Sequence, residues 1–205
     1  MRRRWVLIAA GVVVFALVAG QILIPGLGER SIENRLTEGG GSADVTLGAF
    51  PAARLLFSDG ERIEVEAHDL NLELGREVGV FDRLDGFGIV DISIDHSRVG
   101  PFALDNFSLS RDGDGAYRLV STATTSPTAL TDYGLDRFEL PGEGIIDALL
   151  SPFVEEVDGP VPLDLDMELT SDEGRIQVVS GGGAVAGFSV DPFAQLITSA
   201  IVVNL

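Results

Sequence analysis

Few residues in this sequence could perform catalysis or bind a metal. The chain of 205 residues has two histidines and no cysteine, so disulfides, thiolate metal sites and a cysteine nucleophile are excluded. His68 and His96 lie beside Asp69 and Asp95, but metal sites usually need three or four converging ligands. We therefore interpret both histidines as surface residues of strands, and we expect no bound metal.

Two glycine-rich segments resemble parts of known motifs. The run Gly181–Gly183 follows Ser180, but it lacks the hydrolase pattern Gly-x-Ser-x-Gly and the lysine of a phosphate-binding loop. The segment Asp112–Gly115 resembles half of a calcium loop without its closing glutamate. Both segments are predicted to be turns or bulges; the alternative for Gly181–Gly183 is a backbone site for a ligand head group. No feature selects a catalytic carboxylate pair, so we expect a protein that is not an enzyme and needs no cofactor.

The distribution of charge argues against a nucleic-acid partner. All 14 basic residues are arginines, and they face 32 acidic residues, which gives a formal net charge of −18. Three of the arginines, Arg2, Arg3 and Arg4, precede the first acidic residue, Glu29. The rest of the chain is therefore even more acidic than the total suggests, whereas recognition of phosphate backbones needs a basic surface.

The N-terminal segment has the composition of a membrane anchor. Residues 1–4 form a basic tip, and residues 5–24 are apolar apart from Gln21. About 20 apolar residues in a helix span the hydrocarbon core of a bilayer, and the arginines favour a cytoplasmic N-terminus. The alternative is a signal peptide cleaved near Val18–Gly20. We expect a single-pass protein of the cell membrane with its body outside the cytoplasm, or a secreted protein if the segment is cleaved.

The remaining chain divides into a short helical joint and one larger domain. Residues 25–42 are predicted to form a helix over Gly28–Glu38, with Ile32 and Leu36 on one face, followed by the glycine-rich break Gly39–Ser42. Residues 43–205 form the domain, where apolar residues alternate with polar ones, as is typical of strands. This alternation occurs at 45–47, 62–74, 90–94, 102–109, 117–125, 163–169 and 176–178. It changes parity within 62–74, at His68–Asp69, which predicts a bulge or bend, and within 102–109, which predicts a bulge.

The predicted strands have one apolar face and one acidic face. Such a pattern is typical of an antiparallel sheet with one face in water. Amphipathic helices predicted at 143–157 and 191–201, together with the helix of the joint, are available to cover the apolar face. We therefore predict an α+β fold in which a long, curved antiparallel sheet wraps around helices. The interior is then either a solid core or an elongated apolar cleft.

One apolar segment has the character of a ligand-contacting lip. Phe50, Leu55, Leu56 and Phe57 stand beside a predicted turn. Core packing is the simpler interpretation, and contact with lipid is the functional one. Arg54 and Arg98 are the candidate partners of a lipid phosphate, because guanidinium groups form strong charge-assisted hydrogen bonds with phosphate.

Several short motifs, taken in order, resemble one known family. They are the acidic helix with Ile32 and Leu36, Val45–Pro51, Arg54–Leu56, Ile63–Leu70, Gly100–Phe102 and Gly181–Phe188. With these motifs the sequence resembles the LmeA-like family of actinobacterial exported phospholipid-binding proteins, which are linked to control of mannan chain length. The resemblance covers most of residues 29–205.

The resemblance implies a lipid-binding function. It implies a membrane-associated, exported protein of the cell envelope that binds phospholipid, with a tubular fold in which a sheet wraps a helix around acyl chains. Phe102 and Phe188, which lie in the motifs that carry the resemblance, and Phe193, on the apolar face of the predicted helix 191–201, are further candidate lipid contacts. The resemblance supplies no catalytic residue. The alternatives are a structural or interaction protein of the envelope with a solid core, or an enzyme of envelope glycan or lipid metabolism.

Overall fold

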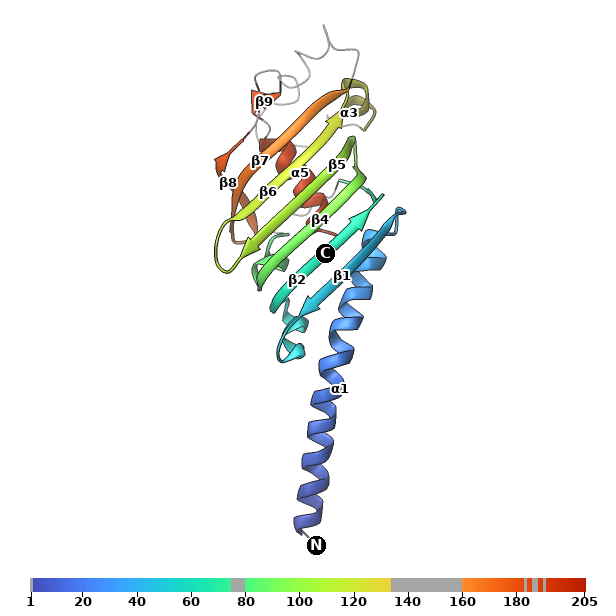
Figure 1. The fold of residues 1–205 in the computed structure, drawn as a ribbon, viewed down its shortest axis with the longest axis vertical. Coiled ribbons are helices and arrows are strands. Elements are labelled where there is room, and N and C mark those ends of the chain that lie inside the picture. The colour runs from blue at the N-terminus through green and yellow to red at the C-terminus, as the bar shows by residue number, and fades with distance from the viewer. Residues whose placement is uncertain (1, 75–79, 134–159, 183, 186–187, 190) are drawn as a thin grey trace.

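A long sheet of eight strands forms the body of the protein (Figure 1). The computed structural model describes residues 2–74, 80–133, 160–182, 184–185, 188–189 and 191–205. The strands follow the order β1-β2-β4-β5-β6-β7-β8, with β3 also paired to β4. Their bounds are β1 Ser42–Gly48, β2 Gly60–His68, β3 Asn71–Leu72, β4 Phe87–Val99, β5 Phe102–Asp112, β6 Tyr117–Thr125, β7 Val161–Asp172 and β8 Arg175–Gly181. The short strands β9 Ala184–Val185 and β10 Phe188–Ser189 form a separate pair.

The α+β class is confirmed, but the prediction of a wholly antiparallel sheet is wrong. Strands β2 and β3 both pair with β4 in parallel, while the other neighbours in the large sheet are antiparallel. Parallel neighbours need a long crossover connection, and residues 69–86 supply it between β2 and β4. Alternation alone reveals which face of a strand is buried and carries no information about the direction of its neighbour.

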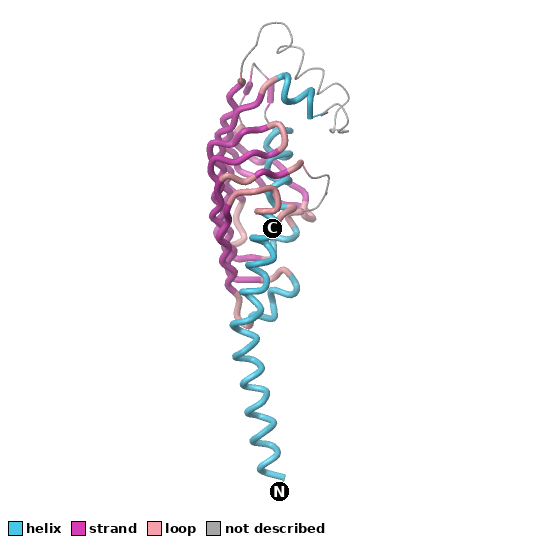
Figure 2. The backbone as a smooth tube through the Cα atoms, turned by 90° about the vertical axis from the view of Figure 1, so that its right-hand side faces the viewer, coloured by secondary structure: helices cyan, strands magenta, loops and turns pink. Residues whose placement is uncertain are grey.

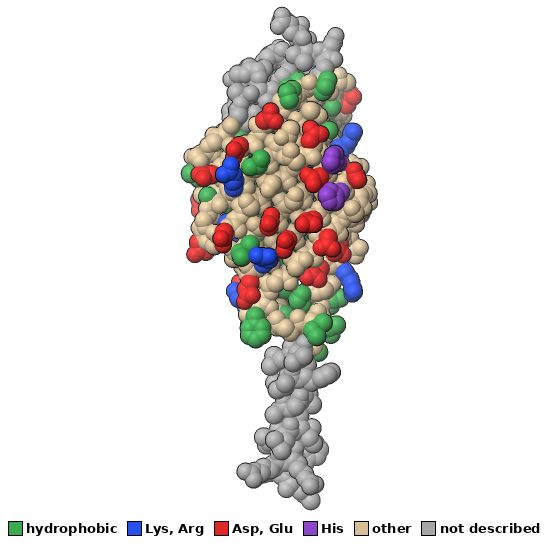
Figure 3. Space-filling view, in the orientation of Figure 1, with side chains coloured by type: hydrophobic (Ala, Val, Ile, Leu, Met, Phe, Trp, Pro, Cys, Tyr) green, Lys and Arg blue, Asp and Glu red, His purple; other side chains and the backbone are tan. Residues whose placement is uncertain are grey.

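The two faces of the sheet differ as the sequence predicts. In β7, Leu163, Leu165, Met167 and Leu169 are buried, and the acidic residues between them are exposed. Figure 3 shows acidic side chains scattered over the outer face rather than gathered in one cluster. The described helices lie on the opposite face of the sheet (Figure 2). The buried apolar residues of the strands form one core cluster with residues of α1, α2 and α5.

Backbone irregularities lie side by side at the end of β2, in β4 and in β5. Asp69 after β2 and His96 in β4 both have positive φ angles, of 57° and 49°. The register between β5 and β6 shifts between Leu104 and Asn106, which are opposite this point. The hydroxyl of Ser97 accepts a hydrogen bond from Leu70 N and donates one to Asp95 O, both at 2.9 Å. Both predicted parity changes are therefore confirmed, and they belong to one connected bend.

The helices differ from the prediction mainly at the N-terminus. Helix α1 spans Arg2–Leu36 without interruption, so the predicted short helix is the end of one 35-residue helix that contains Pro25. The C-terminal helix is confirmed as α5, Asp191–Val202. Short helices also occur: η1 Ala52–Phe57, α2 Asp82–Asp85 and α3 Pro127–Tyr133. The helix predicted at 143–157 lies outside the described residues.

The membrane-anchor prediction rests largely on side chains outside the described part of the chain. The side chains of residues 1–18 are among these, although the helix backbone continues from Arg2. Among the described residues, no helix has an apolar stretch long enough to cross a bilayer. The anchor over residues 5–24 therefore stays a prediction.

A polar cluster fixes α2 against the sheet. Tyr117 is almost fully buried at the start of β6, and its hydroxyl donates to Asp85 Oδ1 at 2.8 Å. Burial is the main cause that raises the pKa of the Tyr117 hydroxyl, and the bond to Asp85 adds to it. Arg111 stacks over the Tyr117 ring at 4.5 Å and donates to Leu84 O at 3.0 Å. This cluster sets the position of the neighbouring Arg83 and Leu84, which line the cleft described next.

Candidate functional site

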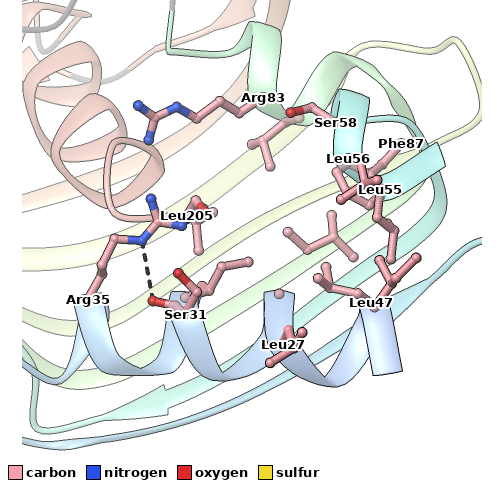
Figure 4. A pocket seen from close by; sticks show the side chains of 15 residues that line it. Leu27, Ser31, Arg35, Leu47, Leu55, Leu56, Ser58, Arg83, Phe87 and Leu205 are labelled. Carbon is pink, nitrogen blue, oxygen red and sulfur yellow. Dashed lines mark hydrogen bonds between the residues drawn. The ribbon is translucent and has the colours of Figure 1, made fainter. Parts of the chain in front are cut away.

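An open cleft lies between α1 and the sheet, on the face that carries the helices (Figure 4). Its volume is about 460 Å³, within the range of roughly 300–1,000 Å³ that is usual for sites that bind small molecules. The walls come from α1, β1, η1, β2, α2 and β4, and the chain end after α5 closes one side. The lining residues are Ile24, Leu27, Gly28, Ser31, Ile32, Arg35, Leu47, Leu55, Leu56, Ser58, Ile63, Arg83, Leu84, Phe87 and Leu205.

Helix α1 forms one wall because its lining residues recur at helical spacing. Ile24, Leu27, Ser31 and Arg35 follow one another at intervals of three or four residues, which puts them on one face of the helix. Gly28 allows α1 to approach β1 closely, since a Cβ atom there would stand 2.8 Å from Leu47 Cδ1. The side of the cleft nearest to β1 is therefore built by close contact between helix and strand.

Two glutamates of α1 hold the edge of the sheet beside the cleft. Leu47 N donates to Glu29 Oε1 at 2.9 Å, and Val45 N donates to Glu33 Oε1 at 3.4 Å. Strand β1 is an edge strand, whose outward N–H groups would otherwise be available to pair with another strand. The two glutamates therefore position α1 along the edge of the sheet and satisfy the N–H groups of Val45 and Leu47.

Exposed apolar side chains gather where α1 leaves the body. We call Ile22, Leu23, Leu27, Phe50, Leu56 and Phe57 the apolar rim; their exposed fractions lie between 61 % and 83 %. Figure 3 shows apolar side chains at this end of the body, beside the emerging helix. Leu27 and Leu56 belong both to the rim and to the lining of the cleft. The cleft therefore opens onto the most apolar part of the described surface.

Gln21 connects the rim residues of α1 with the rim residues in and around η1 through two hydrogen bonds. Its side-chain amide donates to Ala49 O at 2.7 Å, and its amide oxygen accepts from Ala52 N at 2.9 Å. These bonds connect α1 to the two ends of the turn that precedes η1. The single polar residue of the apolar N-terminal segment therefore has a structural role, at the level where the helix meets the body.

The other end of the cleft carries two arginines. Arg35 Nη2 donates to Leu205 O at 2.6 Å and Nε donates to Ser31 O at 3.3 Å, while Arg83 Nη1 donates to Val203 O at 2.5 Å. Partial removal from water is the larger cause that lowers the pKa of Arg35, and the positive charge of Arg83 adds to it. Arg35 and Arg83 thus stand together at the boundary between the apolar cleft and solvent (Figure 4).

The predicted lipid-contacting residues separate into three groups in the structure. Leu55 and Leu56 line the cleft, while Phe50 and Phe57 are exposed on the rim. Phe102 is fully buried in the core of the sheet and does not line the cleft. For Phe188 and Phe193 the side chains lie outside the described ones.

The two arginines predicted to bind phosphate lie elsewhere. Arg54 forms a bidentate ion pair with Asp59, at 2.6 Å and 2.9 Å, and is not part of the cleft lining. The hydrogen bond from Arg54 is the main cause that lowers the pKa of the Asp59 carboxyl. Arg98 is exposed on β4, next to buried Ser97 and Val99, so its side chain points to the outer face.

Sequence reasoning missed Ser31, Arg35 and Arg83 as cleft residues. The helical spacing from Ile24 to Arg35 was a signal that could have revealed the α1 stripe. No comparable signal exists for Arg83, because only the packing of α2 brings it opposite Arg35. In the described part of the chain, no group of three or more histidine and acidic residues could hold a metal ion.

Comparison with known proteins gives no family assignment. No protein-family profile matches the chain, and no curated protein or solved structure is significantly similar to it. The resemblance to the LmeA-like family therefore stays a prediction that rests on short motifs in a particular order.

Proposed function

We propose that this protein is a non-enzymatic, membrane-anchored phospholipid-binding protein whose body lies outside the cytoplasm. The observation that supports the proposal best is the continuity between the apolar cleft and the apolar rim through Leu27 and Leu56. Burial of each CH₂ group contributes roughly 0.8 kcal/mol, so an acyl chain is the natural occupant of such a cleft. A role in assembly of envelope lipids or lipoglycans, and a tubular lipid-binding fold, follow from the family resemblance and are part of this proposal.

The length of the cleft suits one acyl chain. Ile24 and Arg35 are the outermost lining residues on α1 and are eleven residues apart, which corresponds to about 16 Å along a helix. One leaflet occupies half of a hydrocarbon core that is about 30 Å thick. The cleft is therefore about as long as the depth that an acyl chain spans in a leaflet.

The length of α1 supports contact between the rim and the bilayer. The segment from Trp5 to Gly20 covers 16 residues, or about 24 Å of helix, which is shorter than the hydrocarbon core of about 30 Å. If this segment spans the membrane, the next turn of α1, with Ile22 and Leu23, must complete the span, and Leu27 follows directly after it. The rim then lies at the membrane surface, and lipid can enter the cleft without crossing water.

The acidic outer face is compatible with this arrangement. Acidic residues lie mainly on the face of the sheet that points away from the cleft, whereas the described residues that line the cleft include no aspartate or glutamate. Repulsion between the body and anionic lipids is screened within roughly 8–10 Å at physiological salt. Lipid contact therefore depends on the apolar rim and cleft rather than on a basic surface.

The proposal is tested by blocking the cleft from its open side. We compare the full-length chain with Ser31→Trp, in which an indole fills the cleft, and with Asn34→Trp, which changes an exposed residue of α1 that does not line it. Each protein is purified in a mild non-ionic detergent, and the retained phospholipid is extracted and quantified by mass spectrometry.

The control separates lipid in the cleft from lipid around the helix. We expect stoichiometric phospholipid in the unmodified chain and in Asn34→Trp, and loss of most of it in Ser31→Trp. Equal retention by all three proteins would place the lipid around α1 rather than in the cleft. Absence of lipid from all three, with no uptake from phospholipid vesicles, would favour a structural or interaction protein.

A further inference from the structure

The end of the cleft away from the rim is closed by a leucine from a distant part of the chain. Leu205 follows α5 and is almost fully buried, whereas the other described lining residues all lie within residues 24–87. Figure 4 shows Leu205 close to Arg35 and Arg83 and away from Leu27. The side chain of Leu205 therefore belongs to the wall that limits how far the cleft extends along the sheet.

Hydrogen bonds fix Leu205 in this position. Its N–H donates to Val202 O at 3.1 Å, which continues the last turn of α5. Arg35 Nη2 donates to Leu205 O at 2.6 Å, and Arg83 Nη1 donates to Val203 O at 2.5 Å. Cations are favoured at the C-terminal end of a helix, where carbonyl oxygens have no partner within the helix. The two arginines therefore attach the end of α5 to α1 and α2, the helices that carry them.

The packing of α5 prevents Leu205 from moving out of the cleft wall. Ala194, Ile197 and Ile201 of α5 are buried and belong to the same core cluster as the apolar residues of the strands. The helix lies against the sheet on the face that also carries α1 (Figures 1 and 2). Protein interiors are close-packed, so a displacement of α5 would disturb the core. An acyl chain that reaches Leu205 therefore meets a fixed wall.

The position of the rim determines which end of a lipid would reach Leu205. Burial of a polar head group is costly, so the head group stays in water beside the rim while the methyl end of the acyl chain enters the cleft. The buried side chains of Ile32 and Leu84 line the cleft, one turn of α1 before Arg35 and directly after Arg83. The region near Leu205 therefore offers apolar contacts to a methyl end.

We propose that Leu205 is the stop that determines which length of acyl chain the cleft accepts. This inference rests on the proposed lipid-binding function and adds a specificity-determining residue to it. The chain lies along α1 with its methyl end against Leu205 and its head group at the rim. A shorter chain leaves empty space beside Leu205 and loses dispersion contacts. A longer chain has to bend or to push its head group away from the rim.

The size of the side chain at position 205 should therefore set the preferred acyl length. Leu205→Ala removes three carbon atoms from the cleft wall, so the preferred chain should become longer by about two CH₂ groups. Leu205→Phe adds a ring that occupies space in the cleft, so the preferred chain should become shorter. Loss of stability lowers the retention of every lipid and cannot produce opposite shifts in preferred length.

The test is a competition between lipids that differ only in acyl length. The full-length chain in mild non-ionic detergent is incubated with an equimolar mixture of phosphatidylcholines that carry lauroyl, myristoyl, palmitoyl or stearoyl chains. The protein is purified again, and the retained lipids are extracted and quantified by mass spectrometry. Leu205→Ala, Leu205→Phe and the matched control Leu56→Ala are treated in the same way. Leu56→Ala removes the same atoms at the rim end of the cleft, so it should lower the retention of every lipid without changing the preferred length.

The outcomes separate this inference from the proposed function. A shift to longer chains in Leu205→Ala and to shorter chains in Leu205→Phe, with no shift in Leu56→Ala, supports the stop. Retention of lipid with the same length distribution in all variants, or an equal shift in Leu56→Ala, overturns it while lipid binding stands. If Leu205→Ala does not fold, Leu205→Val takes its place and should shift the distribution in the same direction by a smaller amount. Absence of lipid from the unmodified chain contradicts both proposals.

Discussion

The position of the apolar rim relative to the bilayer can be measured with one reporter. Trp5 is the only tryptophan, so Trp5→Phe combined with Phe57→Trp leaves a single indole on the rim. The exposed fractions of Phe50, Leu56 and Phe57 are 72 %, 69 % and 83 %. Transfer of these three exposed side chains from water into hydrocarbon would stabilise contact between the rim and the bilayer by about 3–7 kcal/mol in total. The helix segment Trp5–Gly20 is also about 6 Å shorter than the hydrocarbon core is thick, which likewise favours a position of the rim at the bilayer.

The assay is fluorescence quenching by phospholipids with brominated acyl chains in reconstituted vesicles. The indole introduced by Phe57→Trp should be strongly quenched, with a blue-shifted emission maximum. The matched control is Val179→Trp in the same Trp5→Phe background, because Val179 is 59 % exposed on β8, at the opposite edge of the sheet from β1. Its emission should be that of a water-exposed indole. Equally weak quenching at both positions would refute the placement of the rim at the membrane.

Three further predictions concern the elements around the cleft. Gln21→Leu removes both bonds to the turn before η1, and we expect a loss of about 1–3 kcal/mol in denaturant unfolding with faster amide exchange at residues 49–57. Asp85→Asn weakens the acceptor of the buried Tyr117 hydroxyl, and chemical denaturation should show destabilisation by about 1–3 kcal/mol. Arg54→Gln should return the lowered pKa of Asp59 towards its ordinary value in an NMR titration. Because a depressed carboxyl pKa stabilises the fold above its unfolded value, the stability difference from the unmodified chain should exist at neutral pH and vanish as pH falls through the folded-state pKa.

The alternation of apolar residues predicted which residues are buried, but it could not predict whether the interior is a solid core or contains a cleft. Alternation placed Ile63 and Leu47 on the inner face, and both are buried there. The same residues border the cleft, because α1 packs along the sheet edge and leaves space towards η1 and α2. Burial is a local property of a strand face, whereas a cleft depends on how far a separate helix stands from that face.

The candidate site was predictable only in its apolar part. The segment Phe50–Phe57 was identified because it places four large apolar residues beside a turn. Core packing was the simpler interpretation, whereas Phe50, Leu56 and Phe57 are among the most exposed apolar residues. The candidates Arg54 and Arg98 were chosen for their charge alone. In the structure Arg54 is committed to Asp59, five residues along the chain, and the parity of β4 directs Arg98 outwards.

Several local features of this protein could be predicted from the amino-acid sequence: the acidic and apolar faces of the strands, the irregularities at the two parity changes and the helix α5. Each depends on residues that are close in the chain, so periodicity and turn chemistry are sufficient to predict it. Three features could be known only once the chain was folded: β2 runs parallel to β4, Glu29 and Glu33 cover the edge of β1, and Arg35 lies close to Arg83. These features join segments that are distant in the chain, and their geometry is set by packing against the shared sheet.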